Sequence, residues 1–258
     1  MKLPFNMRFS SLDERNKFYE QFNLEKTKQW IQREVVYAMI LGKHTDIVPK
    51  EYEQDKTTPL IIDEYQSVEY VQEKILQYLP EGVYYDRNVY KDISLCHEKD
   101  LRNVWDWSNF KGQELAFDID PENVDCPIHG TLKQRLQKGM GLSFCEKAFV
   151  LAKKNTLDLF NQLSQQYQQL KIVFSGRGFH IHVLDEHTIS YSRKKREEIA
   201  EKYEEYGIDK WVTTGEMRLI RVPFSLNAVS SRIVLPLKKK EIKQFDPSSE
   251  AIPDFLKD

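Results

Sequence analysis

Apolar residues recur at helical spacing through much of the first eighty residues. The sequence Ser-Leu-Asp-Glu at residues 11–14 is a capping box and predicts a helix that continues to about Phe22. The segments 27–41 and 67–79 also place apolar side chains three and four residues apart, which predicts two further helices. Residues 43–59, between them, are polar and rich in turn-forming residues. We therefore expect the first third of the chain to begin with helices.

Strand patterns become frequent from residue 83 onward. Short apolar or alternating segments predict strands at residues 83–85, 114–119, 171–175, 179–184 and 231–237, and helical patterns lie at 144–170 and 193–206. Residues 219–222 form a short apolar segment that ends at Pro223. The glycine-rich turn at 176–178 joins two strands into a hairpin, and alternation places His180 and His182 on one face. These elements predict a mixed α/β fold around a partly antiparallel sheet, with only the tail after Lys238 loosely organised.

Composition narrows the class of protein without naming a function. The chain has 258 residues, of which 40% are hydrophobic, so it can bury a sizeable core. Its formal net charge of -2 supplies no overall basic field, so any polyanion has to be met by local clusters. Three cysteines and no signal-peptide pattern argue against a disulfide framework and for an intracellular, cytoplasmic protein. No apolar run approaches the roughly 20 residues that span a bilayer, so no membrane partner is expected.

Two aspartates mark the end of one predicted strand. Asp118 and Asp120 flank Ile119, so both side chains leave the same face of the strand. Carboxylates that crowd together repel each other unless a cation neutralises them, and Mg²⁺ or Mn²⁺ is commonly held by such oxygens together with substrate phosphates. A solvated strand end would also tolerate this common pattern.

The hairpin turn carries groups that suit an anion. Ser175, Arg177 and the backbone N–H groups of the two glycines can all donate hydrogen bonds to phosphate oxygens, and His180 follows on the next strand. An ordinary β-turn needs the glycines but not the arginine. A lone histidine, in turn, is more often part of a core than a ligand.

Cysteine and histidine form an incomplete zinc pattern. Cys126 and His129 are separated by two residues, and Cys145 follows, which gives three ligands where a structural zinc site takes four. Asp125, Cys96 and His97 are all open as the fourth ligand. The alternative is two ordinary thiols and a surface histidine.

The order of these pieces resembles the catalytic (small) subunit of archaeo-eukaryotic DNA primases. The resemblance covers residues 114–253 or so and rests on the segments "ELAFDID", "VFSGRGFHIHVLDE", "DKWVTTGEMRLIRVPFSLNAVSSRIVLPL" and "QFDPSSEAIP". It implies an α/β primase catalytic core: a single domain of residues 1–258 with a small zinc-binding insert at about 121–147. The chain is short between the hairpin and Asp209, which implies a reduced member lacking most of the family's helical subdomain.

The resemblance also implies roles for individual residues. Asp118, Asp120 and Asp209 match the family's three ligands of two catalytic Mg²⁺ or Mn²⁺ ions, and Cys126, His129 and Cys145 match a structural Zn²⁺ site. Nucleotide-binding positions are matched by Ser175, Arg177, His180, Arg221 and Asn227, with Arg218 a further candidate. Two positions depart from the family: Asn227 replaces a usual histidine, and Glu64 stands where some relatives have arginine.

The function implied by the resemblance is template-directed nucleotidyl transfer, with synthesis of short primers on single-stranded DNA from NTPs or dNTPs and release of pyrophosphate. A primase large subunit or an equivalent accessory domain is the implied partner. Three alternatives stay open: a primase-polymerase that mainly extends ends with dNTPs, an inactive nucleic-acid-binding module, and a metal-dependent phosphohydrolase.

Overall fold

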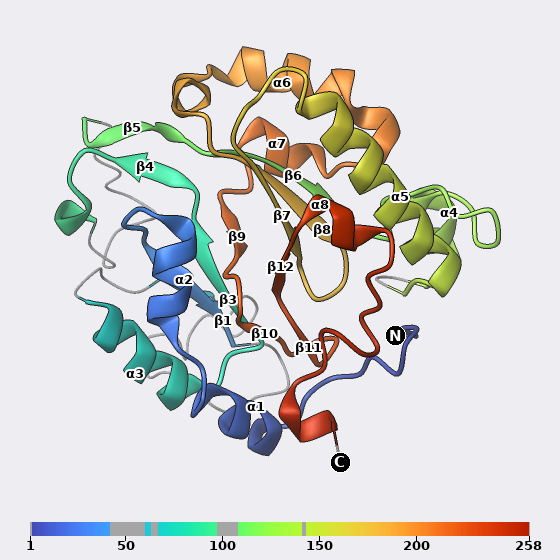
Figure 1. Ribbon diagram of the computed structural model, residues 1–258, viewed down its shortest axis with the longest axis horizontal. Helices are drawn as coiled ribbons and strands as arrows, with labels where there is room; N and C mark the ends of the chain where they lie inside the picture. Colours follow the sequence, from blue (N-terminus) through green and yellow to red (C-terminus); the bar gives the residue numbers. More distant parts are fainter. Residues whose placement is uncertain (1, 42–59, 63–66, 97–107, 141–142, 258) are drawn as a thin grey trace.

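Two four-stranded antiparallel sheets, two smaller two-stranded sheets and the helices around them make up the described part of the molecule (Figure 1). The computed structural model describes residues 2–41, 60–62, 67–96, 108–140 and 143–257. The polar segment 43–59, Glu64 and His97, all singled out in the sequence, lie outside these residues. Within the described ranges, no helix combines the length and the apolar character needed to cross a lipid bilayer.

The first sheet has the strand order β12 (Leu235–Leu237), β7 (Leu170–Phe174), β8 (Phe179–Val183) and β6 (Leu115–Ile119). Its neighbouring strands are all antiparallel, and Asp118 lies opposite His180 in the β6–β8 pair. Alternating apolar residues of β6, β7 and β8 pack on helix α5 (Glu146–Leu163), which covers one face of the sheet. The opposite face carries Asp118, His180 and His182, so the predicted polar groups lie together on the face away from α5.

The second sheet faces this polar side. Its strand order is β2 (Leu60–Ile62), β1 (Tyr37–Ile40), β3 (Gly82–Asp86) and β9 (Leu219–Arg221), and helices α1 (Leu12–Tyr19), α2 (Leu24–Ile31) and α3 (Val68–Tyr78) lie around it (Figure 1). Tyr85 of β3 reaches across with its hydroxyl 3.2 Å from Nδ1 of His182. The sheets therefore meet at the face that carries the candidate site.

Shorter elements complete the fold. They are β4 (Asn88–Tyr90), β5 (Phe110–Gln113), β10 (Leu226–Asn227), β11 (Arg232–Ile233), α4 (Leu132–Gln137), α6 (Arg193–Lys202), α7 (Lys210–Thr214), α8 (Lys239–Ile242), and 3₁₀ turns at Ile93–Leu95, Glu186–Ser190, Glu204–Tyr206 and Asp254–Leu256.

Several sequence predictions are confirmed by these elements. The capping box of α1 is present, with the Glu14 N–H donating to Ser11 Oγ and the Ser11 N–H donating to the Glu14 carboxylate. Helix α3 is capped by Ser67 and ends at Leu79, whose φ of 45° is left-handed. The strands near Val83, Glu114, Lys171 and Phe179 also form, within a residue or two of their expected bounds. The short apolar segment from Leu219 forms strand β9.

The helix expected over residues 27–41 is wrong. Helix α2 begins earlier and ends at Ile31, because Gln32 adopts a left-handed φ of 63°. Residues 37–40 form strand β1 instead, since they pair with both β2 and β3. Apolar spacing alone did not separate a short helix followed by a buried strand from one longer helix.

Three other predictions need correction. Residues 231–237 form two strands instead of one, because β11 pairs with β10 whereas β12 pairs with β7. The long helical patterns end early, at Leu163 and Lys202. The tail after Lys238 is well organised: Phe245 is 1% exposed and its ring lies 4.9 Å from that of Phe174.

Candidate functional site

Three aspartates lie near one another at the end of strand β6. Asp118 is the penultimate residue of β6, and Asp120 is the first residue after the strand. Asp209 is the N-cap of α7, where its Oδ1 accepts the Trp211 N–H at 2.9 Å. The Asp209 N–H donates to the Asp118 carbonyl at 2.8 Å, which fixes α7 against β6. The structure thus places the three aspartates that the resemblance to primases grouped near one another, although their carboxylate oxygens do not form a group in which all three lie within 4.8 Å of one another.

Asp118 is the least compensated of these carboxylates. Its Oδ1 atom is buried and accepts no hydrogen bond from any residue in the described part of the chain; Nε2 of His180 lies 3.6 Å away. Burial raises the pKa of Asp118 well above its usual value, and the negative charges of Asp120 and Asp209 raise it further. An orphaned buried oxygen among repelling carboxylates fits a hard divalent cation such as Mg²⁺ or Mn²⁺.

Glu122 is a fourth carboxylate of the site that the sequence reasoning missed. It is 4% exposed, and burial together with the charge of Asp120 raises its pKa to about 8. Arg177 donates to it through the same Nη2 that donates to Asp120 Oδ2 at 2.9 Å. A glutamate in a loop has no periodic signal, and only its position four residues after Asp118 could have drawn attention to it.

Arg177 is the positive charge nearest to these carboxylates among the predicted nucleotide-binding residues. Burial lowers its pKa, but Asp120 and Glu122 outweigh burial and the net pKa is raised. Its guanidinium therefore stays charged and compensates two of the four acids. The predicted contact of Arg177 with phosphate stays a prediction, since in this structure its Nη2 group contacts carboxylates.

The turn that carries Arg177 is built by close contacts. Ser175 Oγ accepts the Gly178 N–H at 3.0 Å, and Gly176 has a φ of 91°, which favours glycine. A Cβ atom on Gly178 would lie 2.3 Å from Asp120 Oδ1, so only glycine allows the turn to approach the carboxylates this closely. Asn227 supports the turn from β10 by donating to the Ser175 carbonyl at 3.0 Å, and the nucleotide contact suggested for it stays a prediction.

His180 lies beside Asp118 as a neutral ring. Burial lowers the pKa of His180 well below its usual value, and the neighbouring His182 adds to this effect. Its Nδ1 atom is buried without a hydrogen-bond partner among the described residues. The ring can therefore offer a hydrogen bond or accept one at this position, but it does not supply a positive charge.

His182, on the same face, belongs to a different cluster. Its Nδ1 is 2.8 Å from Glu114 Oε1, and Arg33 binds the other oxygen of Glu114 at 3.0 Å. Although burial acts in the opposite direction, the hydrogen bond from His182 and nearby cations lower the pKa of Glu114 to about 2. This cluster is a compensated ion-pair network at the start of β6.

The two predicted arginines on strand β9 and just before it differ in their contacts. Arg218 is paired with Asp86 of β3. Arg221 has its guanidinium carbon 4.8 Å from the centre of the Tyr84 ring, and its buried Nη1 makes no hydrogen bond to the rest of the described chain. Arg221 is therefore the better candidate for binding an anion.

Cys126, His129 and Cys145 form a compact cluster beside the carboxylates in sequence. Their ligand atoms all lie within 4.8 Å of one another, with Cys126 Sγ 3.5 Å from His129 Nδ1 and 3.7 Å from Cys145 Sγ. Burial opposes ionisation of Cys126, but the N–H groups of His129 and Ile128 help to lower its pKa. Two sulfurs and an imidazole nitrogen suit Zn²⁺.

The fourth ligand of that cluster is not found among the described residues. Asp125 and Cys96 were open as candidates, and neither joins the group that the structure forms from its described histidine, cysteine and acidic side chains. Cys96 instead lies 3.9 Å from the Asn109 amide. The described residues thus supply three ligands to this cluster.

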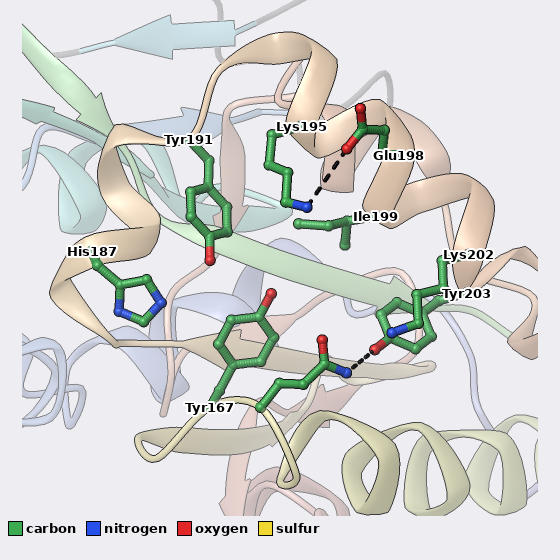
Figure 2. A pocket seen from close by; sticks show the side chains of 9 residues that line it. Tyr167, His187, Tyr191, Lys195, Glu198, Ile199, Lys202 and Tyr203 are labelled. Atoms are coloured by element: carbon green, nitrogen blue, oxygen red, sulfur yellow. Dashed lines mark hydrogen bonds and ion pairs between the residues drawn. The ribbon is translucent and has the colours of Figure 1, made fainter.

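A cavity of about 280 Å³ lies elsewhere, between α6 and the end of α5 (Figure 2). Figure 2 shows Tyr167 and Tyr191 pointing toward each other across it, with Lys195 paired to Glu198. The Gln166 amide also donates to the Tyr203 hydroxyl at 2.7 Å. Its lining includes none of the acidic, hairpin or cysteine residues above. This cavity is therefore separate from the candidate site.

The fold is similar to that of a solved polymerase domain. The structure matches the polymerase domain of Mycobacterium tuberculosis Ligase D, solved in complex with DNA, with a TM-score of 0.54 and 12% sequence identity. The match covers 98% of this chain and 91% of that one. Its mixture of helices and antiparallel sheets agrees with the fold class expected from the sequence.

Sequence comparison gives the family. The chain is 51% identical over 262 residues to an uncharacterized DNA primase small subunit-like protein of Archaeoglobus fulgidus, covering 99% of this chain and 94% of that protein. It belongs to the family of DNA primase small subunit-like proteins, as its motifs indicated.

More distant relatives are named primase subunits. The DNA primase small subunit PriS of Pyrobaculum calidifontis is 25% identical over 70% of this chain and 67% of the relative. PriS of Pyrococcus furiosus is 27% identical over 61% of this chain, but the matched part is less than half, 46%, of that protein. No family model matches the chain.

Proposed function

We propose that the chain is a template-directed nucleotidyltransferase of the primase small-subunit type, which makes short primers on single-stranded DNA. The observation that carries this proposal is the proximity of Asp118, Asp120 and Asp209 to one another, beside the Ser175–Gly178 turn. Family membership and the primase-polymerase fold support it.

The carboxylates are the proposed ligands of two Mg²⁺ or Mn²⁺ ions. Asp118, Asp120 and Asp209 would hold them, and bound cations would supply charge neutralisation at the reacting phosphate and activation of the attacking 3′-hydroxyl. The orphaned Asp118 Oδ1 supports this assignment. The carboxylates would thereby set where the reaction occurs.

The neighbouring side chains are the proposed triphosphate site. Arg221 offers an Nη1 that makes no hydrogen bond within the described part of the chain, and Arg177 offers a charged guanidinium beside the turn. Ser175 and Asn227 would act by holding the turn, through Ser175 Oγ and the bond from Asn227 to the Ser175 carbonyl. Arg221 and Arg177 would orient the nucleotide so that pyrophosphate leaves in line with the attacking hydroxyl.

Two further components belong to the proposal. The Cys126, His129 and Cys145 cluster would hold a structural Zn²⁺ within an insert at about 121–147. A single-stranded DNA template and a large subunit, or an equivalent accessory domain, are the proposed partners, because several relatives are named primase small subunits.

A priming assay tests the proposal directly. Labelled NTPs or dNTPs are incubated with single-stranded DNA and Mg²⁺ or Mn²⁺, with and without a large subunit, and dinucleotide formation and pyrophosphate release are measured. We expect template-dependent synthesis that Asp118→Asn abolishes. Release of inorganic phosphate without a template would instead identify a phosphohydrolase, and single-strand binding without synthesis would identify an inactive binding module.

Extension of existing ends is the second candidate, favoured by the likeness to a ligase-associated polymerase domain. The same assay with a hybridised primer separates the two. A protein that extends this primer with dNTPs, but forms no dinucleotide from free nucleotides with any partner, is a primase-polymerase dedicated to extension.

A further inference from the structure

Arg135 is a buried cation whose role the proposed function does not explain. It lies on α4, it is 1% exposed, and its guanidinium donates to three backbone carbonyls: Pro121 at 3.3 Å, Val124 at 3.3 Å and Glu122. A charge taken out of water has to be compensated by hydrogen bonds. Three carbonyls of one short segment supply them here.

The segment that Arg135 holds follows directly from the catalytic strand. Residues 121–124 begin after Asp120, and the Asn123 N–H donates to the Asp120 carbonyl at 2.9 Å. The segment also carries the Glu122 carboxylate, which shares Arg177 with Asp120. The backbone position of residues 121–124 therefore determines where two acids and one cation of the site lie.

Helix α4 is itself tied to the cysteine and histidine cluster. Cys126 and Gly130 form a backbone bridge, and α4 begins immediately after it, at a capping box between Thr131 and Gln134. Arg135 thus lies on the helix that follows the cysteine and histidine cluster, and it binds the backbone of the segment that follows Asp120. Of the contacts described, it links the α4 helix to the segment after Asp120 most directly.

We propose that Arg135 is a positioning residue for the cation site, and that through it the cysteine and histidine module holds Asp120 and Glu122 in place. This inference rests on the proposed cation site. Arg135 touches no reacting group, so it acts through the backbone of residues 121–124. Residues that orient metal ligands typically change metal affinity by about 10- to 100-fold when they are replaced.

The test compares two buried arginines. Arg135→Lys keeps the charge but replaces the two donor nitrogens, Nη1 and Nη2, by a single ammonium nitrogen on a flexible stem, which loses the fixed geometry of the guanidinium. Arg196→Lys is the matched control: Arg196 is 4% exposed, lies on α6, and donates to the carbonyls of Gln113, Thr188 and Tyr191, near the opposite end of β6. Both variants lose similar structural bonds, so a purely structural role predicts similar behaviour.

Mn²⁺ binding is measured by the electron paramagnetic resonance signal of the free ion, on protein whose zinc content has been determined, and thermal unfolding is recorded in parallel. We expect the dissociation constant for Mn²⁺ to rise about 10-fold in Arg135→Lys and to stay at the wild-type value in Arg196→Lys. The Mn²⁺ concentration that half-saturates nucleotide incorporation should shift in the same way.

The outcomes separate this inference from the proposed function. Equal Mn²⁺ affinity of Arg135→Lys and Arg196→Lys, in folded proteins, would overturn the role of Arg135 and leave the cation site standing. If Asp118→Asn binds as much Mn²⁺ as the wild type, or the wild type binds none, the proposed cation site is wrong and this inference is wrong with it. Should Arg135→Lys not fold, Arg135→Gln is measured against Arg196→Gln by the same readout.

Discussion

Strands β6 and β8 carry two carboxylate and histidine pairs with opposite electrostatics. At the start of β6, Glu114 lies 2.8 Å from His182 and its pKa is lowered to about 2. At the end of the same strand, Asp118 lies 3.6 Å from His180 and its pKa is raised well above the usual value. The charge of Glu114 is compensated by side chains of the protein, whereas the charge of Asp118 requires a bound cation.

The difference follows from the neighbours of each pair. Glu114 has Arg33 and His182 as hydrogen-bond donors. Asp118 has other carboxylates, and the nearest arginine, Arg177, donates to Asp120 and Glu122 instead. A buried ion network is complete without a ligand, but an excess of buried carboxylates is a binding site for cations.

Asp118→Asn gives the largest expected effect. Loss of a cation ligand should remove several kcal/mol of transition-state stabilisation, which lowers the rate of nucleotide incorporation by about 1000-fold or more. In the presence of a chelator its unfolding temperature should not fall, because one repelling charge is removed. Incorporation assays and thermal unfolding check the two halves, and activity near the wild-type level would contradict the assignment.

Glu114→Gln should show the opposite pattern. It breaks a buried pair and leaves His182 and Arg33 without their anion, so the free energy of unfolding should fall by about 3 to 5 kcal/mol. Urea denaturation measures this, with the exposed Glu197→Gln as a control that should change stability by less than about 1 kcal/mol. Unchanged stability of Glu114→Gln would show that the pair is not a completed network.

The pH dependence of stability distinguishes the two clusters. Folding raises the pKa of Glu122 from 4.5 to about 8, so this group favours the folded state below pH 4.5 and loses that contribution as the pH rises to about 8. In a chelator, the unfolding temperature should therefore decline across this window, and Mn²⁺ should reduce the decline.

Glu114 contributes in the other direction and at lower pH. Its folded pKa is depressed, so its contribution is present above pH 4.5 and is lost as the pH falls toward 2. Glu122→Gln is the informative variant, since it should remove much of the decline between pH 4.5 and 8. A wild-type decline that Glu122→Gln leaves unaltered would disprove the assignment to Glu122.

Asn227→Ala should have the smallest effect. It removes the donor to the Ser175 carbonyl, which costs about 1 to 2 kcal/mol of unfolding free energy, and it loosens the turn that carries Arg177. Asn155→Ala is the control, because Asn155 makes a comparable bond to the Tyr206 carbonyl away from the site. Stability should fall in both, but the KM for nucleotide should rise only in Asn227→Ala; equal KM values would make Asn227 purely structural.

Local sequence patterns correctly predicted the features that depend only on residues close together in the sequence. The alternation of Phe179–Val183 placed His180 and His182 on one face, and the spacing of Asp118 and Asp120 gave a strand end with two acids. The capping box of α1 was correct for the same reason, since all its hydrogen bonds lie within four residues.

Contacts between distant residues could not be predicted in this way. Asp209 lies beside Asp118 through a bond across 91 positions, and only the resemblance to primases grouped them. Glu122 and Arg135 resemble ordinary surface residues in the sequence and become buried through tertiary packing. Residues 231–237 read as one strand, but their two halves pair with different sheets, which no local pattern encodes.

The position of Phe245 near the end of the chain determines when the candidate site becomes fully supported during synthesis. Phe245 lies against Phe174 and Phe179, beneath the hairpin that carries Arg177, and β12 forms the edge of the same sheet. Chains fold as they are synthesised from the N-terminus, so every residue of the candidate site leaves the ribosome before the parts that complete its support. A nascent chain that reaches only Asn227 would hold all the site's side chains without the sheet edge and aromatic core that keep them in place.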